Sequence, residues 1–208
     1  MTEVITETKF EKLFSSPLFR YRVTNHEALC KALLAEGVMM RSEDEGVTKS
    51  NRRGWHSTGN LFVRKSDCIT DLRVAVEMSV LNATRKMTNK VDPESLKMKL
   101  FGWMNVSPKN GYNAPHTHPG AHWSGVYYVA QPESDVGDSG KIEFVAPRVD
   151  LPHWEILQTS AFRLKRRFRP VAGEIILFPS YLLHWVYPNE ADADRVTVAF
   201  NATFRKQA

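Results

Sequence analysis

The sequence predicts a mainly β protein with flanking helices, of the sandwich, jelly-roll or barrel class. From about residue 97 the chain consists of short segments rich in β-branched and aromatic residues, which are typical of strands. Turn-forming pairs such as Pro119-Gly120 and Pro188-Asn189 separate these segments. The expected strands are 97–107, 123–130, 141–145, 162–168, 174–178, 182–187 and 195–204.

The overall composition is that of one globular domain. The chain has 208 residues, of which 42% are hydrophobic and 25% charged, enough to bury a core. We expect residues 1–95 to form a mixed helical support and residues 96–208 to form the β core. No apolar run is long enough to span a membrane and the N-terminus does not resemble a signal peptide. With only two cysteines, the chain is not expected to have a disulfide scaffold. A cytoplasmic location is expected.

Two helices are expected before the strands. Thr24-Asn-His-Glu27 has the form of a capping box, and Gly37 is expected to end the first helix. A second helix is expected from about Thr70 to Met87, because its apolar residues recur at three- and four-residue spacing. This helix should pack on the outside of a sheet. The polar segment 42–59 between them is expected to be a long loop.

Three histidines are the candidate metal ligands. His116 and His118 lie two apart in an extended segment, so both imidazoles can point to the same side. His184 lies on a later strand that can return beside the first. Three ligands on one face leave positions open for a co-substrate and oxygen, as in non-haem iron(II) oxygenases. Ordinary surface or hydrogen-bonded histidines are the alternative.

Arg195 is the candidate anchor for an acid. It opens a strand with Thr197 on the same face, and a charge that faces into a small barrel must be paired. An arginine fork matches a carboxylate bidentately, and the Thr197 hydroxyl can add a donor. The expected guest is the 5-carboxylate of 2-oxoglutarate.

Together these segments resemble the Fe(II)/2-oxoglutarate-dependent dioxygenases of the prolyl-hydroxylase-like group, and especially a bacterial and phage subgroup of 2OG-Fe(II) oxygenases. The resemblance implies a double-stranded β-helix (jelly roll, cupin-like) and hydroxylation of a substrate with release of succinate and CO2. It assigns His116 and His184 to the metal, and Arg195 and Tyr128 to the distal carboxylate of 2-oxoglutarate. The segments that carry it are His116–His118, 124–129, 139–144, 173–179, His184 and 195–197, with a short further match at 50–57.

His118 departs from the family pattern, which has Asp or Glu at this position. The neutral imidazole leaves more of the Fe²⁺ charge uncompensated. Two other classes of protein therefore remain as alternatives. The first is a cupin-type three-histidine dioxygenase or isomerase that does not use 2-oxoglutarate. The second is a non-catalytic jelly-roll binding module.

Further residues are expected around this site. Ser124 shares a strand face with Tyr128 and, with Asn105, is expected to bind the co-substrate. The basic segment 162–169 favours an anionic small molecule or peptide as substrate; neither a membrane nor nucleic acid is expected, and a homodimer is left open. The candidate substrate contacts are Trp123, Trp185, His122 and Arg148.

Overall fold

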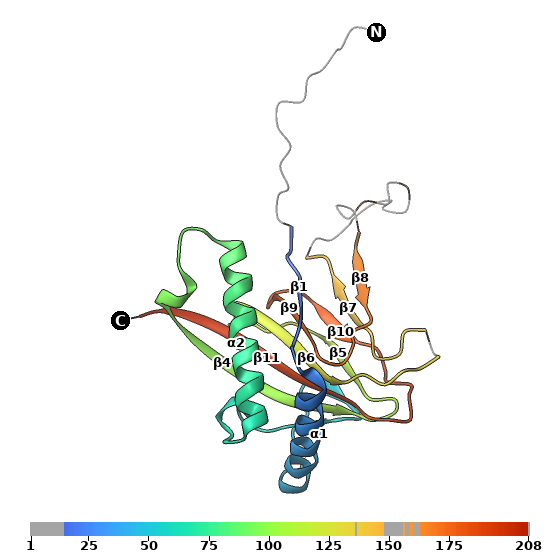
Figure 1. Cartoon of the computed structure of the whole chain (residues 1–208). Coiled ribbons are helices and arrows are strands. Elements are labelled where there is room, and N and C mark those ends of the chain that lie inside the picture. Colours follow the sequence, from blue (N-terminus) through green and yellow to red (C-terminus); the bar gives the residue numbers. More distant parts are fainter. Residues whose placement is uncertain (1–14, 136, 148–155, 157–158, 160–162, 208) are drawn as a thin grey trace.

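Two antiparallel sheets form the body of the protein in a computed structural model that describes residues 15–135, 137–147, 156, 159 and 163–207. The larger sheet has the strand order β1-β9-β6-β11-β4-β3, and the smaller sheet has the order β2-β5-β10-β7-β8. Figure 1 shows the two sheets and the helices beside them. The strands are β1 (Phe19–Arg22), β2 (Asn51–Arg52), β3 (Trp55–His56), β4 (Leu96–Ser107), β5 (Tyr112–His116), β6 (Trp123–Ala130), β7 (Ile142–Val145), β8 (Lys165–Phe168), β9 (Glu174–Pro179), β10 (His184–Val186) and β11 (Arg195–Lys206).

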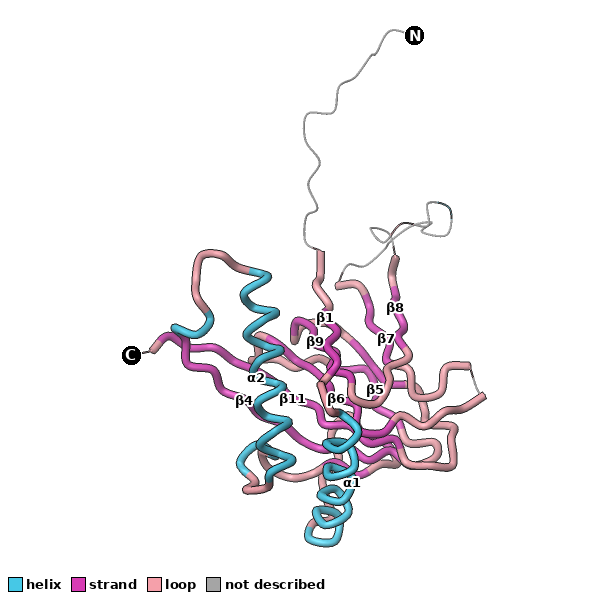
Figure 2. The backbone as a smooth tube through the Cα atoms, viewed as in Figure 1, coloured by secondary structure: helices cyan, strands magenta, loops and turns pink. Residues whose placement is uncertain are grey.

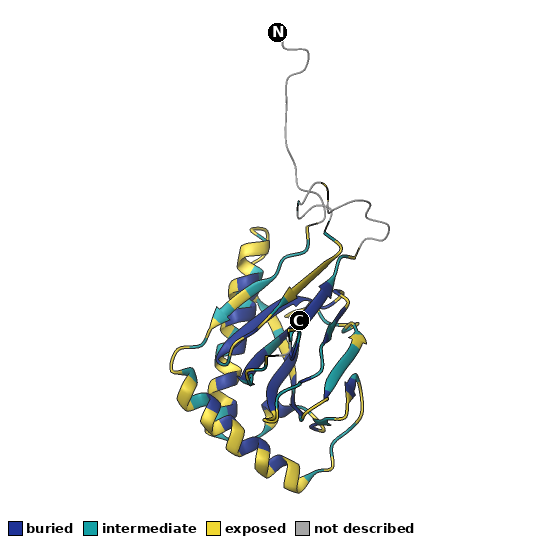
Figure 3. Cartoon of the chain, turned by 90° about the vertical axis from the view of Figure 1, so that its right-hand side faces the viewer, coloured by how far each residue is buried: buried dark blue, intermediate teal, exposed yellow. Residues whose placement is uncertain are grey.

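Two helices, α1 (His26–Glu43) and α2 (Asp67–Met87), lie against the larger sheet, as the tube in Figure 2 shows. Short 3₁₀ turns, η1 (Leu61–Val63) and η2 (Pro93–Ser95), flank α2. The buried faces of both helices join the outer face of the sheet in one hydrophobic core, and Figure 3 shows the helices buried on one side only. The expected packing of the second helix on a sheet is therefore confirmed. No helix in the described part of the chain is both long and apolar enough to cross a membrane.

Strand alternation divides the larger sheet into a helix side and an inner side. On β6, Tyr127 belongs to the core beneath the helices, whereas Tyr128 belongs to a second cluster between the sheets. On β11, Val196 and Val198 face the helices. Arg195 immediately precedes Val196, and neighbouring side chains on a strand point to opposite faces of the sheet. Arg195 therefore lies on the inner side.

The first helix is longer than predicted, and its start differs. Asn25, not Thr24, is the N-cap residue; it has a left-handed backbone (φ 54°) and its side chain makes no capping bond. Gly37 is buried inside α1, where a Cβ atom would lie 2.7 Å from the Met104 sulfur. This glycine permits close helix–sheet approach and does not end the helix.

The strand predictions from residue 97 onward correspond to observed strands, although β8 begins at Lys165 and not at residue 162. β1 and β5 were not predicted as strands, and the polar segment 42–59 is not wholly a loop. Within this segment, β2 pairs with β5 of the smaller sheet and β3 pairs with β4 of the larger sheet. The segment thus bridges the two sheets, which its polar composition does not reveal.

Phe200 is central to the core on the helix side. Its side chain is fully buried, and a Cβ atom on Gly125 would meet its ring at 2.3 Å. We expect Phe200→Ala to lower the free energy of unfolding by about 3–5 kcal/mol, because it leaves a cavity. Urea denaturation measures this change, with Val38→Ala as the control because Val38 is 71% exposed. Equal losses in the two variants would contradict this role for Phe200.

Candidate metal centre

The structure brings the three predicted histidines together at neighbouring strands of the smaller sheet. His116 ends β5 and pairs in register with His184, which begins β10. His118 follows β5, and its backbone N–H donates to the carbonyl of Ser180 at 2.9 Å. One ligand atom from each imidazole lies within 4.8 Å of the other two. This spacing allows a single ion to contact all three rings.

The hydrogen bonds of two rings leave their outer nitrogens available. His116 Nδ1 donates to the carbonyl of Ala114 at 2.7 Å, and His184 Nδ1 donates to the carbonyl of Leu182 at 2.9 Å. Each bond favours the tautomer whose Nε2 carries a free lone pair. The Ser50 hydroxyl lies 3.4 Å from His116 Nε2. The segment that bridges the sheets therefore reaches the metal centre.

Burial keeps these histidines neutral near neutral pH. It lowers the pKa of His116, lowers that of His118 to about 4 and lowers that of His184 to about 3, and the neighbouring His116 adds to the last two shifts. Neutral imidazoles are the form that binds transition metals. The donor set of three neutral nitrogens fits Fe²⁺, and it also accepts zinc or copper.

Arg195 lies in a buried polar pocket on the inner side of the larger sheet. Its side chain is 2% exposed, and its Nε donates to Gln131 Oε1 at 2.9 Å. Its guanidinium lies 5.3 Å from the centre of the Tyr128 ring. Burial lowers the pKa of Arg195, and among the described residues no carboxylate forms an ion pair with it. A buried cation in this state requires an anionic partner.

Unpartnered polar atoms accompany the guanidinium. Tyr128 Oη, Gln131 Nε2 and Asn105 Oδ1 are buried and have no hydrogen-bond partner within the described structure. Burial raises the pKa of Tyr128 to about 12, so its hydroxyl remains a donor. Asn105 is paired in register with Thr197. Arg195, Tyr128 and Gln131 together offer donors that suit a carboxylate.

Ser124 is on the same inner face, as predicted, but it already has a partner. Its hydroxyl donates to Asn201 Oδ1 at 2.7 Å. Tyr127 points to the opposite face, where its hydroxyl lies 3.2 Å from the Cys30 sulfur. Ser124 therefore lies on the inner face of the larger sheet, and its contact with a co-substrate stays a prediction.

Two of the predicted substrate contacts, Trp123 and Trp185, lie on strands next to residues that point inward. Trp123 precedes the inward-facing Ser124, so it points to the helix side, where its Nε1 donates to Thr84 Oγ1 at 3.0 Å. Trp185 follows the inward-facing His184 and lies on the outer face beside the Lys165 ammonium, 5.1 Å from its ring centre. Strand alternation turns both tryptophans away from the inner face, and their contact with a substrate stays a prediction.

The other two predicted substrate contacts are His122 and Arg148, and their role stays a prediction. His122 is exposed and its Nδ1 accepts a hydrogen bond from the Phe204 backbone N–H at 3.2 Å. Arg148 lies outside the described residues.

Other residues near the centre were not predicted. The Trp103 ring contacts those of His118 and His56, with centroids 5.7 and 5.6 Å away, and is stacked on that of His56. Trp103 is two residues before Asn105 on β4, so alternation could have placed it on the inner face. Gln131 follows the end of β6 and breaks the alternation, so no sequence signal identified it.

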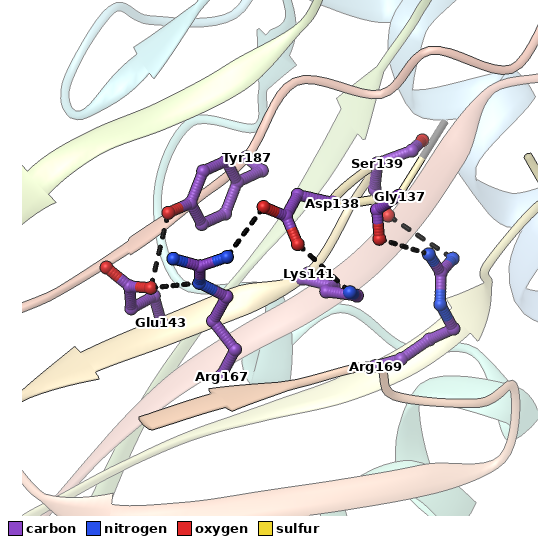
Figure 4. Close-up of polar contacts among 8 residues, drawn as sticks. All are labelled: Gly137, Asp138, Ser139, Lys141, Glu143, Arg167, Arg169 and Tyr187. Carbon is purple, nitrogen blue, oxygen red and sulfur yellow. Dashed lines mark hydrogen bonds and ion pairs between the residues drawn. The ribbon is translucent and has the colours of Figure 1, made fainter. Parts of the chain in front are cut away.

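A polar network on the outer face of the smaller sheet fastens the strands that carry the centre (Figure 4). Glu143 on β7 is fully buried, accepts from Arg167 on β8, and accepts from the Tyr187 hydroxyl at 3.2 Å. Arg167 also pairs with Asp138 at 2.7 Å. These contacts hold β7, β8 and the end of β10 together, which fixes the strand that begins with His184.

Comparisons with known proteins agree with this arrangement. Residues 102–201 match the family model described as "Putative 2OG-Fe(II) oxygenase". No curated protein matches the chain significantly. A prolyl-4-hydroxylase from Pseudomonas putida is similar in structure, with a TM-score of 0.64 and 14% identity over 93% of this chain and 95% of that chain.

Two further solved structures are similar. HygX from Streptomyces hygroscopicus, with nickel and 2-oxoglutarate bound, has a TM-score of 0.61 and 14% identity over 90% of this chain and 83% of that chain. The epimerase SnoN from nogalamycin biosynthesis has a TM-score of 0.61 and 14% identity over 90% of this chain and 76% of that chain. At such identities these likenesses show the fold alone, and they confirm the predicted double-stranded β-helix with flanking helices.

Proposed function

Because residues 102–201 match the family model of 2-oxoglutarate- and iron(II)-dependent oxygenases, we propose that this protein is an enzyme that oxidises a substrate at a three-histidine iron centre, releasing succinate and CO2. Hydroxylation is the proposed outcome. The observation that supports 2-oxoglutarate most directly is the buried Arg195 guanidinium, which has no carboxylate partner among the described residues. A cytoplasmic location is also proposed, because the chain has only two cysteines, Cys30 and Cys68, and neither is in a disulfide.

The chain's own residues bind and orient the reactants. His116, His118 and His184 would hold the metal through ring nitrogens, while Arg195 and Tyr128 would bind the distal carboxylate of the keto acid. Iron and 2-oxoglutarate, when bound, supply the oxygen activation and the oxidative decarboxylation. Burial of Arg195 and Tyr128 excludes water from the carboxylate, which strengthens their contacts with it. These contacts would hold the distal end of the co-substrate in place before a substrate binds.

A direct test measures succinate formation by purified protein supplied with Fe²⁺, oxygen and 2-oxoglutarate but no substrate. Slow uncoupled turnover is expected, together with saturable binding of 2-oxoglutarate in calorimetry under argon. The three-histidine set also suits the cupin-type enzymes that use no keto acid. Iron binding without any 2-oxoglutarate binding would favour that second candidate, and an absence of stoichiometric transition metal would favour a binding module.

His118 offers a prediction specific to this chain. We expect His118→Asp to retain metal binding and uncoupled turnover, because a carboxylate oxygen is also a good iron ligand and adds a negative charge beside Fe²⁺. His118→Ala should weaken metal binding by more than about 100-fold, since it removes a ligand and not merely a residue that orients one. Metal titration compares the two variants with Thr117→Ala, an exposed neighbour. Equal affinity in His118→Ala and wild type would show that His118 does not bind the metal.

A further inference from the structure

A row of paired residues crosses the smaller sheet and begins at the metal centre. His116 on β5 pairs with His184 on β10, His184 pairs with Phe144 on β7, and Phe144 pairs with Arg166 on β8. Residues paired directly across neighbouring strands point to the same face of a sheet. Arg166 is therefore on the same face as the histidines, at the edge strand of the sheet.

Ring contacts along this row agree with the register. The Phe144 and His184 ring centroids are 5.7 Å apart, and those of Phe144 and Phe168 are 6.0 Å apart. The Arg166 guanidinium carbon lies 5.4 Å from the centre of the Phe168 ring. Since neighbouring strands are about 4.8 Å apart, Arg166 is two strand spacings, about 10 Å, from His184. Between them in this row lies the apolar ring of Phe144, which is 5% exposed.

The neighbouring basic side chains already have acceptors. Arg167 and Lys165 face outward and pair with the buried Glu143. Arg169 donates to the backbone carbonyls of Gly137 and Ser139 at 3.0 and 3.4 Å (Figure 4). Arg20, whose guanidinium carbon lies 6.0 Å from the centre of the Phe168 ring, pairs with Glu174. Arg166 differs from these four cations, because no described carboxylate pairs with it.

We propose that Arg166 binds an anionic group of the substrate, and that the substrate is a small organic acid whose apolar part lies over Phe144 and extends toward the three histidines. This inference rests on the proposed function, because it places the reacting carbon at the metal centre. The charge of Arg166 selects an acid over its neutral analogue. The apolar ring of Phe144 in the row between Arg166 and His184 favours a hydrocarbon segment between the acid group and the carbon that reacts.

The test uses defined probes, namely the straight-chain acids from butyrate to octanoate and their primary amides. Binding is measured by calorimetry under argon with the Fe²⁺-loaded protein and saturating 2-oxoglutarate, so that Arg195 is occupied. In wild type, at least one acid should bind about tenfold more tightly than its amide, because a charge-assisted contact is lost in the amide. Arg166→Ala should remove this preference, and Arg166→Lys should restore part of it.

Lys165→Ala is the matched control, because it removes one positive charge from the outward face of the same strand. This variant should keep the preference for acids, and thermal unfolding should show that both alanine variants are folded. The proposal is overturned by equal binding of acids and amides to wild type, by no binding of any acid, or by a preference that survives in Arg166→Ala. Failure of the proposed function has a different signature, since wild type would then neither bind 2-oxoglutarate nor form succinate.

Discussion

His184→Ala is expected to abolish stoichiometric metal binding and, with it, all succinate formation. His184 is the most buried of the three histidines, at 3% exposure, and its ring lies 4.3 and 5.2 Å from those of His116 and His118. Loss of a residue that only orients a ligand costs about 10–100-fold in metal affinity. Loss of the ligand itself is therefore expected to exceed about 100-fold. Metal analysis and titration with Fe²⁺ or Co²⁺ measure the change.

His122→Ala is the matched control for this experiment, since His122 is an exposed histidine in the same segment of chain. It should bind metal as wild type does. His184→Ala leaves a buried gap, so its fold is checked by circular dichroism before metal binding is compared. A folded His184→Ala protein that still bound one metal ion tightly would show that the three histidines do not form the metal centre.

Periodicity and turn chemistry predicted most of the fold, because the strands after residue 97 alternate cleanly and end at proline or glycine. Pairing partners were beyond the sequence alone. The two-residue strands β2 and β3 have almost no periodicity, and they exist because β5 and β4 supply their hydrogen-bond partners. Gly37 shows the same limit, since only the approach of Met104 distinguishes a packing glycine from a helix terminator.

At the site, alternation correctly placed Tyr128 and Arg195 on the inner face, and residue spacing correctly grouped the three histidines. Strand alternation in the sequence also indicates that Trp123 and Trp185 point outward, because each is adjacent to an inward-facing residue. Gln131 and Arg166 could not be found in this way. Gln131 follows an irregularity in the pairing of β6 with β11, and the orientation of Arg166 depends on the register of β8 with β7.

Arg195→Ala is expected to weaken 2-oxoglutarate binding by about 30-fold to several thousand-fold, because truncating one partner of a buried charge pair costs about 2–5 kcal/mol. The specific signature is a loss of discrimination between keto acids. Wild type should prefer 2-oxoglutarate to pyruvate, which lacks the distal carboxylate, and the variant should bind the two almost equally. Calorimetry with Fe²⁺-loaded protein under argon measures both affinities, while metal binding itself should be unchanged.

Arg195→Met separates a binding role from a structural one. The guanidinium is buried without a described carboxylate partner, so its replacement by an apolar side chain of similar length should not lower the unfolding midpoint of the protein without 2-oxoglutarate. Adding 2-oxoglutarate should raise the midpoint of wild type, since a ligand that binds only the folded state stabilises it, and should leave that of the variant unchanged. An equal rise in both proteins would mean that the co-substrate carboxylate is bound elsewhere. A large loss of stability in the variant alone would instead make Arg195 part of the folded framework, with Gln131 as its structural partner.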